Sequence, residues 1–184
     1  MKKEKAALFD LDGTLFDTTL VNFFSYKEAL NKFGHDFSQE FYLEQCHGRV
    51  FRDFLPLIIG QDNPDQPFIH QLKKELYPKH LHHAKQNDFL FDIIRALRNT
   101  YYIGLVTTAS QKNVMDILDY FRVKDLFELI LTQEDVLQSK PSPEGYLKAM
   151  SHFKVAPSDT IIYEDSEVGL AAARASGAHI LKIE

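Results

Sequence analysis

The sequence predicts an α/β protein with a doubly wound parallel sheet as its core and a helical segment inserted into that core. Three features of the 184-residue chain lead to this prediction. Short runs that are apolar throughout recur along the chain, longer amphipathic segments separate them, and one long aromatic segment interrupts the alternation. Uniformly apolar runs are typical of strands that are covered on both faces of a parallel sheet.

Five apolar runs are the expected strands, namely residues 6–9, 101–106, 129–131, 161–163 and 180–183. The segments between them are expected to be helical. Residues 111–121 carry apolar side chains at helical spacing. Residues 166–176 begin with a capping serine and are followed by Gly177, so they also predict a helix.

The region 17–87 breaks this alternation, because it is long, aromatic and helix-patterned and shows no convincing strand. We therefore expect residues 17–87 to form a helical cap domain, and residues 1–16 and 88–184 to form the α/β core. An insertion after the first strand is expected to lie over the C-terminal edge of the sheet, where open α/β sheets bind their ligands. There it would exclude water and select substrates.

Composition excludes several classes of protein. The net charge of -5 provides no basic surface for nucleic acid and fits poorly with an anionic membrane. The single cysteine, Cys46, rules out an internal disulfide and favours a reducing cytoplasm. The first apolar run is interrupted too early for an export signal, and no run is long enough to span a membrane. We expect a cytoplasmic protein, monomeric or homodimeric.

Two carboxylates, Asp10 and Asp12, end the first apolar run and precede the turn at Gly13. Side chains two residues apart on a strand point to the same side, and the glycine can direct both into one crevice. Two carboxylates 4 Å apart repel each other by about 4 kcal/mol at an effective dielectric constant near 20. Such a pair indicates a divalent cation, a shared proton or both. The alternative is a solvated Asp-Gly turn.

Further polar motifs follow the next three predicted strands. Thr107 and Thr108 precede a helix, where hydroxyls and free backbone amides form a good anion site. Lys140 stands at the entrance of another helix, and Glu164 with Asp165 forms a second acidic pair before a third. Each motif alone has an ordinary explanation, such as a solvated loop lysine or a helix cap. Together, at the ends of successive strands, they predict a phosphate site with Mg²⁺.

This ordered set of motifs resembles the haloacid dehalogenase superfamily of phosphotransferases, over nearly the whole chain. It is most similar to the branch with a helical cap after the first strand, which includes phosphoglycolate phosphatase-like and β-phosphoglucomutase-like enzymes. Residues 9–17 match the first motif of the family at every defining position, and residues 162–177 match its last motif and the following helix. The resemblance implies a Rossmann-like core.

The resemblance also implies roles for single residues. Asp10 would be the nucleophile that takes the phosphoryl group as an aspartyl phosphate, and Asp12 the general acid and base. Thr107, with Thr108 and the nearby backbone amides, would hold phosphoryl oxygens. Lys140 would neutralise the phosphate and keep the nucleophile ionised.

A metal ion is implied in the same way. Asp165 would bind Mg²⁺ alongside the Asp10 carboxylate and the backbone carbonyl of Asp12, with Glu164 as a further ligand or support. A carboxylate cannot approach a phosphate dianion unless positive charge offsets the repulsion, and Mg²⁺ with Lys140 would supply it.

We therefore expect a Mg²⁺-dependent phosphatase that hydrolyses a small phosphate ester. Asp12 argues against a dehalogenase, which needs no acid at that position. A β-phosphoglucomutase-like enzyme would carry a histidine ten residues after the general acid, where this chain has Asn22, which cannot titrate. A catalytically idle module that binds a phosphorylated ligand or a partner protein is the remaining alternative. Its site would have no physical need for mutually repelling carboxylates.

Two groups in the inserted segment are weaker candidates. Arg49 and Arg52 would bind a second anionic group of the substrate, although solvated arginines at a helix start are an equally good interpretation. His80, His82 and His83 form a local cluster in which two histidines would share one helix face. Without a nearby acid or cysteine to complete a metal site, a solvated surface is favoured for the histidines.

Overall fold

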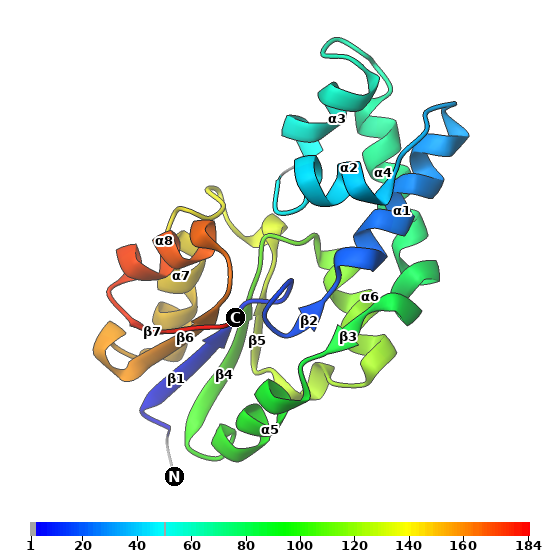
Figure 1. Cartoon of the computed structure of the whole chain (residues 1–184). Coiled ribbons are helices and arrows are strands. Elements are labelled where there is room, and N and C mark those ends of the chain that lie inside the picture. The colour runs from blue at the N-terminus through cyan, green and yellow to red at the C-terminus, as the bar shows by residue number, and fades with distance from the viewer. Residues whose placement is uncertain (1–2, 50) are drawn as a thin grey trace. The chain divides into compact units, whose positions relative to one another are not determined.

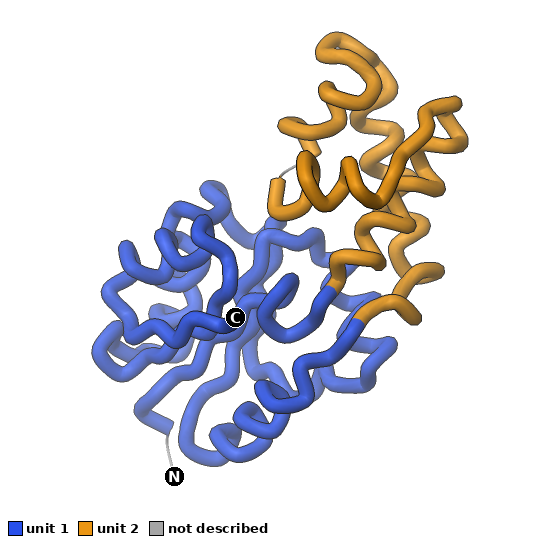
Figure 2. Tube along the Cα trace, viewed as in Figure 1, with its two compact units in different colours: residues 1–17, 85–184 blue, residues 18–84 orange. Residues whose placement is uncertain are grey.

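The structure is a computed structural model, and it describes residues 3–49 and 51–184. The chain forms two compact units, which Figure 2 shows in different colours. We call Met1–Asp17 together with Lys85–Glu184 the core unit, and Thr18–Ala84 the cap unit. The function of the cap unit as a cover over a substrate stays a prediction.

The core unit contains a five-stranded sheet in the order β5-β4-β1-β6-β7, with every neighbouring pair parallel. Its strands are β1 (Lys5–Phe9), β4 (Tyr101–Val106), β5 (Leu129–Leu131), β6 (Thr160–Glu164) and β7 (His179–Lys182). The winding reverses beside the central strand β1, so the C-terminal end of β1 is the place where such folds bind ligands. The predicted α/β class with a doubly wound parallel sheet is confirmed.

Four α-helices connect the strands of the core unit, α5 (Asp88–Leu97), α6 (Gln111–Phe121), α7 (Glu144–Phe153) and α8 (Glu167–Ser176). Helices α7 and α8 cover one face of the sheet, where their side chains join Ala6, Leu8 and Ile162 in one apolar cluster. Figure 1 shows α5 and α6 on the opposite side of the sheet. Short 3₁₀ turns complete the unit at Lys124–Leu126, Gln133–Asp135 and Pro157–Asp159.

The helix termini follow the capping signals of the sequence. The Ser110 hydroxyl accepts a hydrogen bond from the Asn113 amide at the start of α6, and Ser166 does the same for Gly169 at the start of α8. Helix α8 ends at Gly177, which has φ +78° and adopts the left-handed conformation that glycine tolerates best. These caps fix the strand-to-helix turns that carry the candidate site.

The cap unit is helical, with α1 (Thr19–Lys32), α2 (Gln39–Phe41), a π-helical turn (Tyr42–Cys46), α3 (Phe51–Ile59), α4 (Gln66–Leu76) and a 3₁₀ segment (Tyr77–His83). Its core is mainly aromatic and aliphatic and includes the free cysteine Cys46. No helix in residues 3–49 and 51–184 is long and apolar enough to cross a membrane.

A short antiparallel ribbon joins the two points where the chain passes between the units. Strand β2 (Phe16–Asp17) pairs with β3 (Lys85–Gln86). The expectation that region 17–87 contains no strand is therefore wrong at its ends. The pairing satisfies backbone groups of both passages, and two residues are too short to produce a recognisable strand pattern.

Candidate active site

Asp10 is the residue that follows the last position of β1, and it is 6% exposed. Its backbone amide donates a hydrogen bond to the Tyr163 carbonyl of the neighbouring strand at 3.0 Å, which fixes the carboxylate at the sheet edge. The Lys140 ammonium donates to Asp10 Oδ1 at 2.6 Å and to Glu164 Oε1 at 2.8 Å. The structure thus brings together three of the predicted residues from turns that are distant in sequence.

Glu164, the last residue of β6, is buried and has partners for both of its oxygens. Oε1 accepts from Lys140, while Oε2 accepts from the backbone amide and the hydroxyl of Ser166 at 2.8 and 3.1 Å. A Cβ atom on Gly169, in the first turn of α8, would lie 1.6 Å from Glu164 Oε1. Only glycine leaves room for this carboxylate to lie against the helix.

Three carboxylates form a compact cluster in the described part of the chain, because Asp10, Glu164 and Asp165 each offer an oxygen within 4.8 Å of the others. The Thr14 hydroxyl donates to Asp165 Oδ1 at 2.8 Å. Gly13 has φ +89°, and a Cβ atom there would lie 2.1 Å from Asp165 Oδ2. A set of carboxylate oxygens, closely enclosed by the glycine turn, fits a hard divalent cation such as Mg²⁺.

Asp12 is half-buried in the turn after β1, where it forms an isolated bridge with Phe16. Its carboxylate is not among the three clustered ones. The Asp12 carboxylate nevertheless acts on the cluster, because its negative charge contributes to the raised pKa of Asp10.

The buried ionisable groups at this sheet edge shift one another's pKa values. Burial raises the pKa of Asp10 to about 8, the Lys140 ammonium opposes the shift, and the Glu164 carboxylate adds to it. Burial alone would lower the pKa of Lys140, but the charges of Asp10, Tyr146 and Glu164 outweigh it and raise that pKa above its usual range. The lysine therefore stays charged. One ammonium does not offset three ionised carboxylates, so the Asp10 carboxyl tends to keep its proton, and a bound cation would favour its ionised form.

The surroundings of Asp165 likewise disfavour its ionised form. Burial raises the pKa of its carboxyl, and the neighbouring Glu164 carboxylate adds to the rise. The hydrogen bond from Thr14 acts in the opposite direction. The fold thus keeps these carboxylates together although their burial and mutual repulsion are unfavourable.

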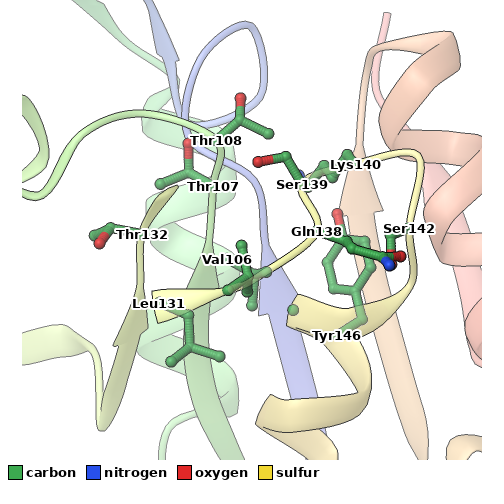
Figure 3. Close-up of a pocket in the computed structure, with 12 residues that line it drawn as sticks. Val106, Thr107, Thr108, Leu131, Thr132, Gln138, Ser139, Lys140, Ser142 and Tyr146 are labelled. Carbon is green, nitrogen blue, oxygen red and sulfur yellow. The ribbon is translucent and has the colours of Figure 1, made fainter. Parts of the chain in front are cut away.

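Thr107 follows β4 and is buried, whereas its neighbour Thr108 is exposed. The Thr107 backbone amide donates to the Leu131 carbonyl at 3.0 Å, and Thr107 Oγ1 accepts from the Ala109 amide at 3.0 Å. Figure 3 shows both threonines beside the loop that carries Ser139 and Lys140, around one pocket. The predicted phosphate-binding residues thus lie on the walls of a shared cavity.

Arg49 and Arg52 are exposed residues of the cap unit, and the structure describes them within that unit only. The Arg52 guanidinium lies 5.4 Å from the centroid of the Phe51 ring. Among the predicted site residues, these two are the only ones outside the core unit. Their contact with a substrate stays a prediction.

The histidine cluster of the cap unit is tied into local contacts. His80 Nε2 lies 3.0 Å from Glu28 Oε2, and the His82 and His83 rings lie 4.0 Å apart. Within residues 3–49 and 51–184, no group that includes these histidines brings three metal-ligating atoms together. They form an ordinary surface network.

Two further residues, Thr14 and Tyr146, lie at the charged cluster without having been predicted from the sequence. Thr14 directly follows Gly13 in the first motif, so its position in the turn was an available signal. Tyr146 lies in the first turn of α7, and the Lys140 ammonium is 5.0 Å from its ring centroid. No local pattern reveals this contact, because only the folded path of the loop before α7 creates it.

Comparisons with known proteins agree with this geometry. A family model described as haloacid dehalogenase-like hydrolase matches residues 7–183. A phosphorylated carbohydrates phosphatase of Thermotoga maritima is 25% identical over 184 residues, with 94% of this chain and 82% of that protein covered. The β-phosphoglucomutase of Bacillus subtilis is 27% identical over 184 residues, with coverage of 94% and 80%.

A solved structure gives the same result. The crystal structure of CbbY from Rhodobacter sphaeroides in complex with phosphate has a TM-score of 0.84 and 27% identity, and the match covers 96% of this chain and 84% of that one. The match to the family model extends over almost the entire sequence and includes all four motifs of the charged cluster and its pocket. The chain therefore belongs to the haloacid dehalogenase-like hydrolase family.

Proposed function

We propose that this protein is a Mg²⁺-dependent phosphatase that hydrolyses a small phosphorylated metabolite through an aspartyl phosphate on Asp10. The observation that carries the proposal is the buried Asp10 carboxylate, held by Lys140 at 2.6 Å within a cluster of three carboxylates at the sheet edge. Relatives that are named phosphatases support the same reaction class. The presence of Cys46 as a buried free thiol fits a reducing cytoplasm as the place of action.

Asp10, Glu164 and Asp165 would hold the Mg²⁺ ion, together with the backbone carbonyl of Asp12. The bound ion would offset the negative charge that the carboxylates and an incoming phosphate bring together. Lys140 supplies a fixed positive charge at the same place, and its bond to Glu164 keeps the ammonium oriented toward the nucleophile.

The reaction proceeds in two displacements. In the first, a carboxylate oxygen of Asp10 forms a bond to phosphorus, the bond from phosphorus to the ester oxygen breaks, and Asp12 gives its proton to the departing oxygen. In the second, a water oxygen forms a bond to phosphorus, Asp12 takes the water proton, and the bond from phosphorus to Asp10 breaks. The net reaction converts the ester and water into an alcohol and inorganic phosphate.

Thr107 is well placed to bind a phosphoryl oxygen. Its Oγ1 accepts a hydrogen bond from the Ala109 amide, so the hydroxyl hydrogen is available for donation to a phosphate. Thr108 and the amides before α6 would add donors to the same anion. Lys140 faces this pocket from the other side, as Figure 3 shows.

Asn22 favours hydrolysis over phosphoryl transfer between two positions of a sugar. Its side-chain amide donates to the Thr18 carbonyl at 3.2 Å and to the Thr18 hydroxyl at 3.1 Å, so both of its N–H groups serve its own helix. An amide cannot gain or lose a proton near neutrality. A mutase would need a group here that retains the intermediate against water.

The substrate would be selected by the cap unit. Arg49 lies in the segment before α3 and Arg52 in the first turn of that helix, and their exposed positive charges suit a phosphate ester with a second anionic group. A solvated pair of arginines is the alternative, and it predicts no change in substrate preference when either is removed. The partner of such a phosphatase would be a small phosphate ester, and the protein would act as a monomer or homodimer.

Hydrolysis of an aryl phosphate with and without Mg²⁺ tests the proposal. We expect release of inorganic phosphate only when Mg²⁺ is present. A folded sample that releases none under either condition would contradict a phosphatase and favour a binding module. Incubation with a hexose 1-phosphate distinguishes a phosphatase from a phosphomutase. Release of phosphate supports hydrolysis, whereas formation of the 6-phosphate isomer identifies a mutase.

A further inference from the structure

Tyr146 is the most unusual buried polar residue beside the charged cluster. It is 1% exposed, and its hydroxyl oxygen has no hydrogen-bond partner among the residues that the structure describes. Figure 3 shows the hydroxyl directed toward the loop that carries Ser139 and Lys140, inside the pocket that Thr107 and Thr108 also line. An unpaired buried hydroxyl lowers stability, so a phenylalanine at this position would fold better.

The Lys140 ammonium lies close to this residue, with its nitrogen 5.0 Å from the Tyr146 ring centroid. Burial raises the pKa of Tyr146, and Lys140 is the strongest influence in the opposite direction, as expected for a cation close to the phenol oxygen. Lys140 uses two of its three N–H groups on Asp10 and Glu164. Tyr146 therefore offers a hydroxyl acceptor beside an ammonium with a free donor.

The proposed reaction changes the surroundings of this ammonium. When the phosphoryl group is bonded to Asp10, the carboxylate has become an acyl phosphate, and the negative charge lies on the phosphoryl oxygens instead of on the Asp10 oxygen that Lys140 contacts. The bond from Lys140 to Asp10 weakens at that point, because hydrogen bonds between two ionised groups are the stronger ones. The lysine then keeps Glu164 as its only carboxylate partner.

We propose that Tyr146 is a positioning residue for the second half of the reaction. Its hydroxyl oxygen accepts the N–H of Lys140 that Asp10 holds in the free protein, and thereby keeps the ammonium in place while water displaces Asp10 from phosphorus. The inference rests on the proposed aspartyl-phosphate mechanism. It gives a role to a buried hydroxyl that lies beside the Lys140 ammonium in the resting protein.

The Tyr146→Phe variant tests this role, because it retains the ring and removes only the hydroxyl. We expect kcat to fall about tenfold, the loss that follows removal of a hydrogen bond to a charged group. KM should fall by the same factor, since kcat/KM reports the steps up to formation of the aspartyl phosphate, which do not need this hydroxyl. The fraction of protein trapped as aspartyl phosphate during turnover should rise, while the midpoint of thermal unfolding stays equal or increases.

Two further variants complete the experiment. Tyr102→Phe is the matched control, because Tyr102 is a half-buried tyrosine at the start of β4 that stacks on Phe153 at 4.8 Å, away from the charged cluster. It should leave kcat, KM and the trapped fraction unchanged. Tyr146→Leu removes the ring as well and should show the same kinetic pattern with a lower thermal midpoint.

Two results would overturn the inference. One is a Tyr146→Phe protein with the parental kcat, KM and trapped fraction. The other is a fall in kcat at unchanged KM without more trapped aspartyl phosphate, which indicates a structural role. Failure of the wider mechanism is distinguishable, because a parent protein that turns over without any aspartyl phosphate would contradict the proposed function itself and with it the role of Tyr146.

Discussion

Both units of this protein enclose ionisable side chains, but the surroundings of these side chains differ. The core unit crowds like charges together, whereas the cap unit places its ionisable groups against aromatic rings. In the core unit, Asp10, Glu164 and Asp165 hold their carboxylate oxygens within 4.8 Å of one another, with Lys140 as their ammonium partner. The cluster keeps an excess of like charge in a place that water hardly reaches. Such an arrangement is favourable only in the presence of a further cation.

In the cap unit, His70 and Lys73 lie against aromatic rings. His70 Nδ1 lies 2.8 Å from the Tyr26 hydroxyl, and the His70 ring stacks on Phe51 with centroids 3.7 Å apart. Burial lowers the pKa of His70 to about 3, so the ring is neutral at physiological pH. The buried Lys73 lies 4.8 Å from the Tyr77 ring centroid, in cation–π contact.

The difference shows which kind of buried charge indicates a functional site. The cap unit neutralises its histidine and surrounds its lysine with rings, so its interior has no need of an ion. The core unit accumulates carboxylates that repel one another. Burial of a titratable group is therefore a weak sign of function, whereas crowding of like charges at a sheet edge is a strong one.

The largest effect is expected from Asp10→Asn, which removes the proposed nucleophile. Activity should fall by at least about 10³-fold, because an amide cannot form the acyl phosphate. The thermal midpoint should stay equal or rise, since one of the repelling charges is gone. Asp92→Asn is the control, because the Asp92 side chain is 77% exposed on α5. An Asp10→Asn protein that retains a tenth of the parental rate would contradict the nucleophile assignment.

Removal of divalent cations should have the next largest effect. A chelator is expected to abolish phosphate release, and Mg²⁺ at 100 times its dissociation constant should raise the free energy of unfolding by about 2.7 kcal/mol. Calorimetry with and without Mg²⁺ measures this shift. Asp165→Asn should reduce it, because a neutral amide replaces one of the clustered carboxylates. A rate unaffected by chelation would disprove the metal dependence.

The cap unit should respond to pH in the manner of a half-buried, neutral histidine, His70. The folded pKa of His70 lies near 3, below the usual 6.5, so the unfolded chain takes up a proton first as the pH falls. The stabilising contribution is complete above pH 6.5 and is lost toward pH 3, by up to about 1.4 kcal/mol per pH unit. Urea unfolding at pH 7.5 and 5.5 measures this slope.

His70→Gln should reduce the slope, because glutamine does not titrate and keeps an acceptor for the Tyr26 hydroxyl. His152→Gln, at an exposed position of α7, should leave it unchanged. Equal slopes for the parent and His70→Gln would show that the aromatic contacts do not hold this histidine neutral.

The smallest effect is expected from Arg52→Ala. If Arg52 binds a second anionic group, KM for esters that carry such a group should rise severalfold, with kcat and the KM of simpler esters unchanged. Arg98→Ala, an exposed arginine after α5, serves as the control. A panel of phosphate esters with identical KM values for parent and variant would remove Arg52 from the substrate contacts.

The sequence predicts the fold well where local patterns and long-range structure agree. The central runs are apolar because both faces of the sheet are covered, and capping serines and Gly177 mark the helix ends. The ribbon strand β3 could not be foreseen, because Lys85 and Gln86 become a strand only through pairing with Phe16 and Asp17. Pairing partners distant in sequence produce no local pattern.

The candidate site is predictable to a similar degree. Asp10, Lys140 and Glu164 follow apolar runs, so their position at one sheet edge is a consequence of parallel strands. The relation of Tyr146 to Lys140 depends on the exact course of a loop and is absent from the sequence pattern. The roles of Arg49 and Arg52 depend on what the cap unit contacts during catalysis, which no pattern in the chain expresses.

The ribbon of β2 and β3 has a consequence for how such a molecule can be rebuilt. Because Asp17 pairs with Lys85, the chain leaves the core unit and returns to it at neighbouring positions. Residues 18–84 are an insertion whose two ends join the core unit at neighbouring strands. A different segment, or a short reverse turn, can close the same gap without moving the charged residues of the core unit, so the insertion can be exchanged independently of the charged cluster.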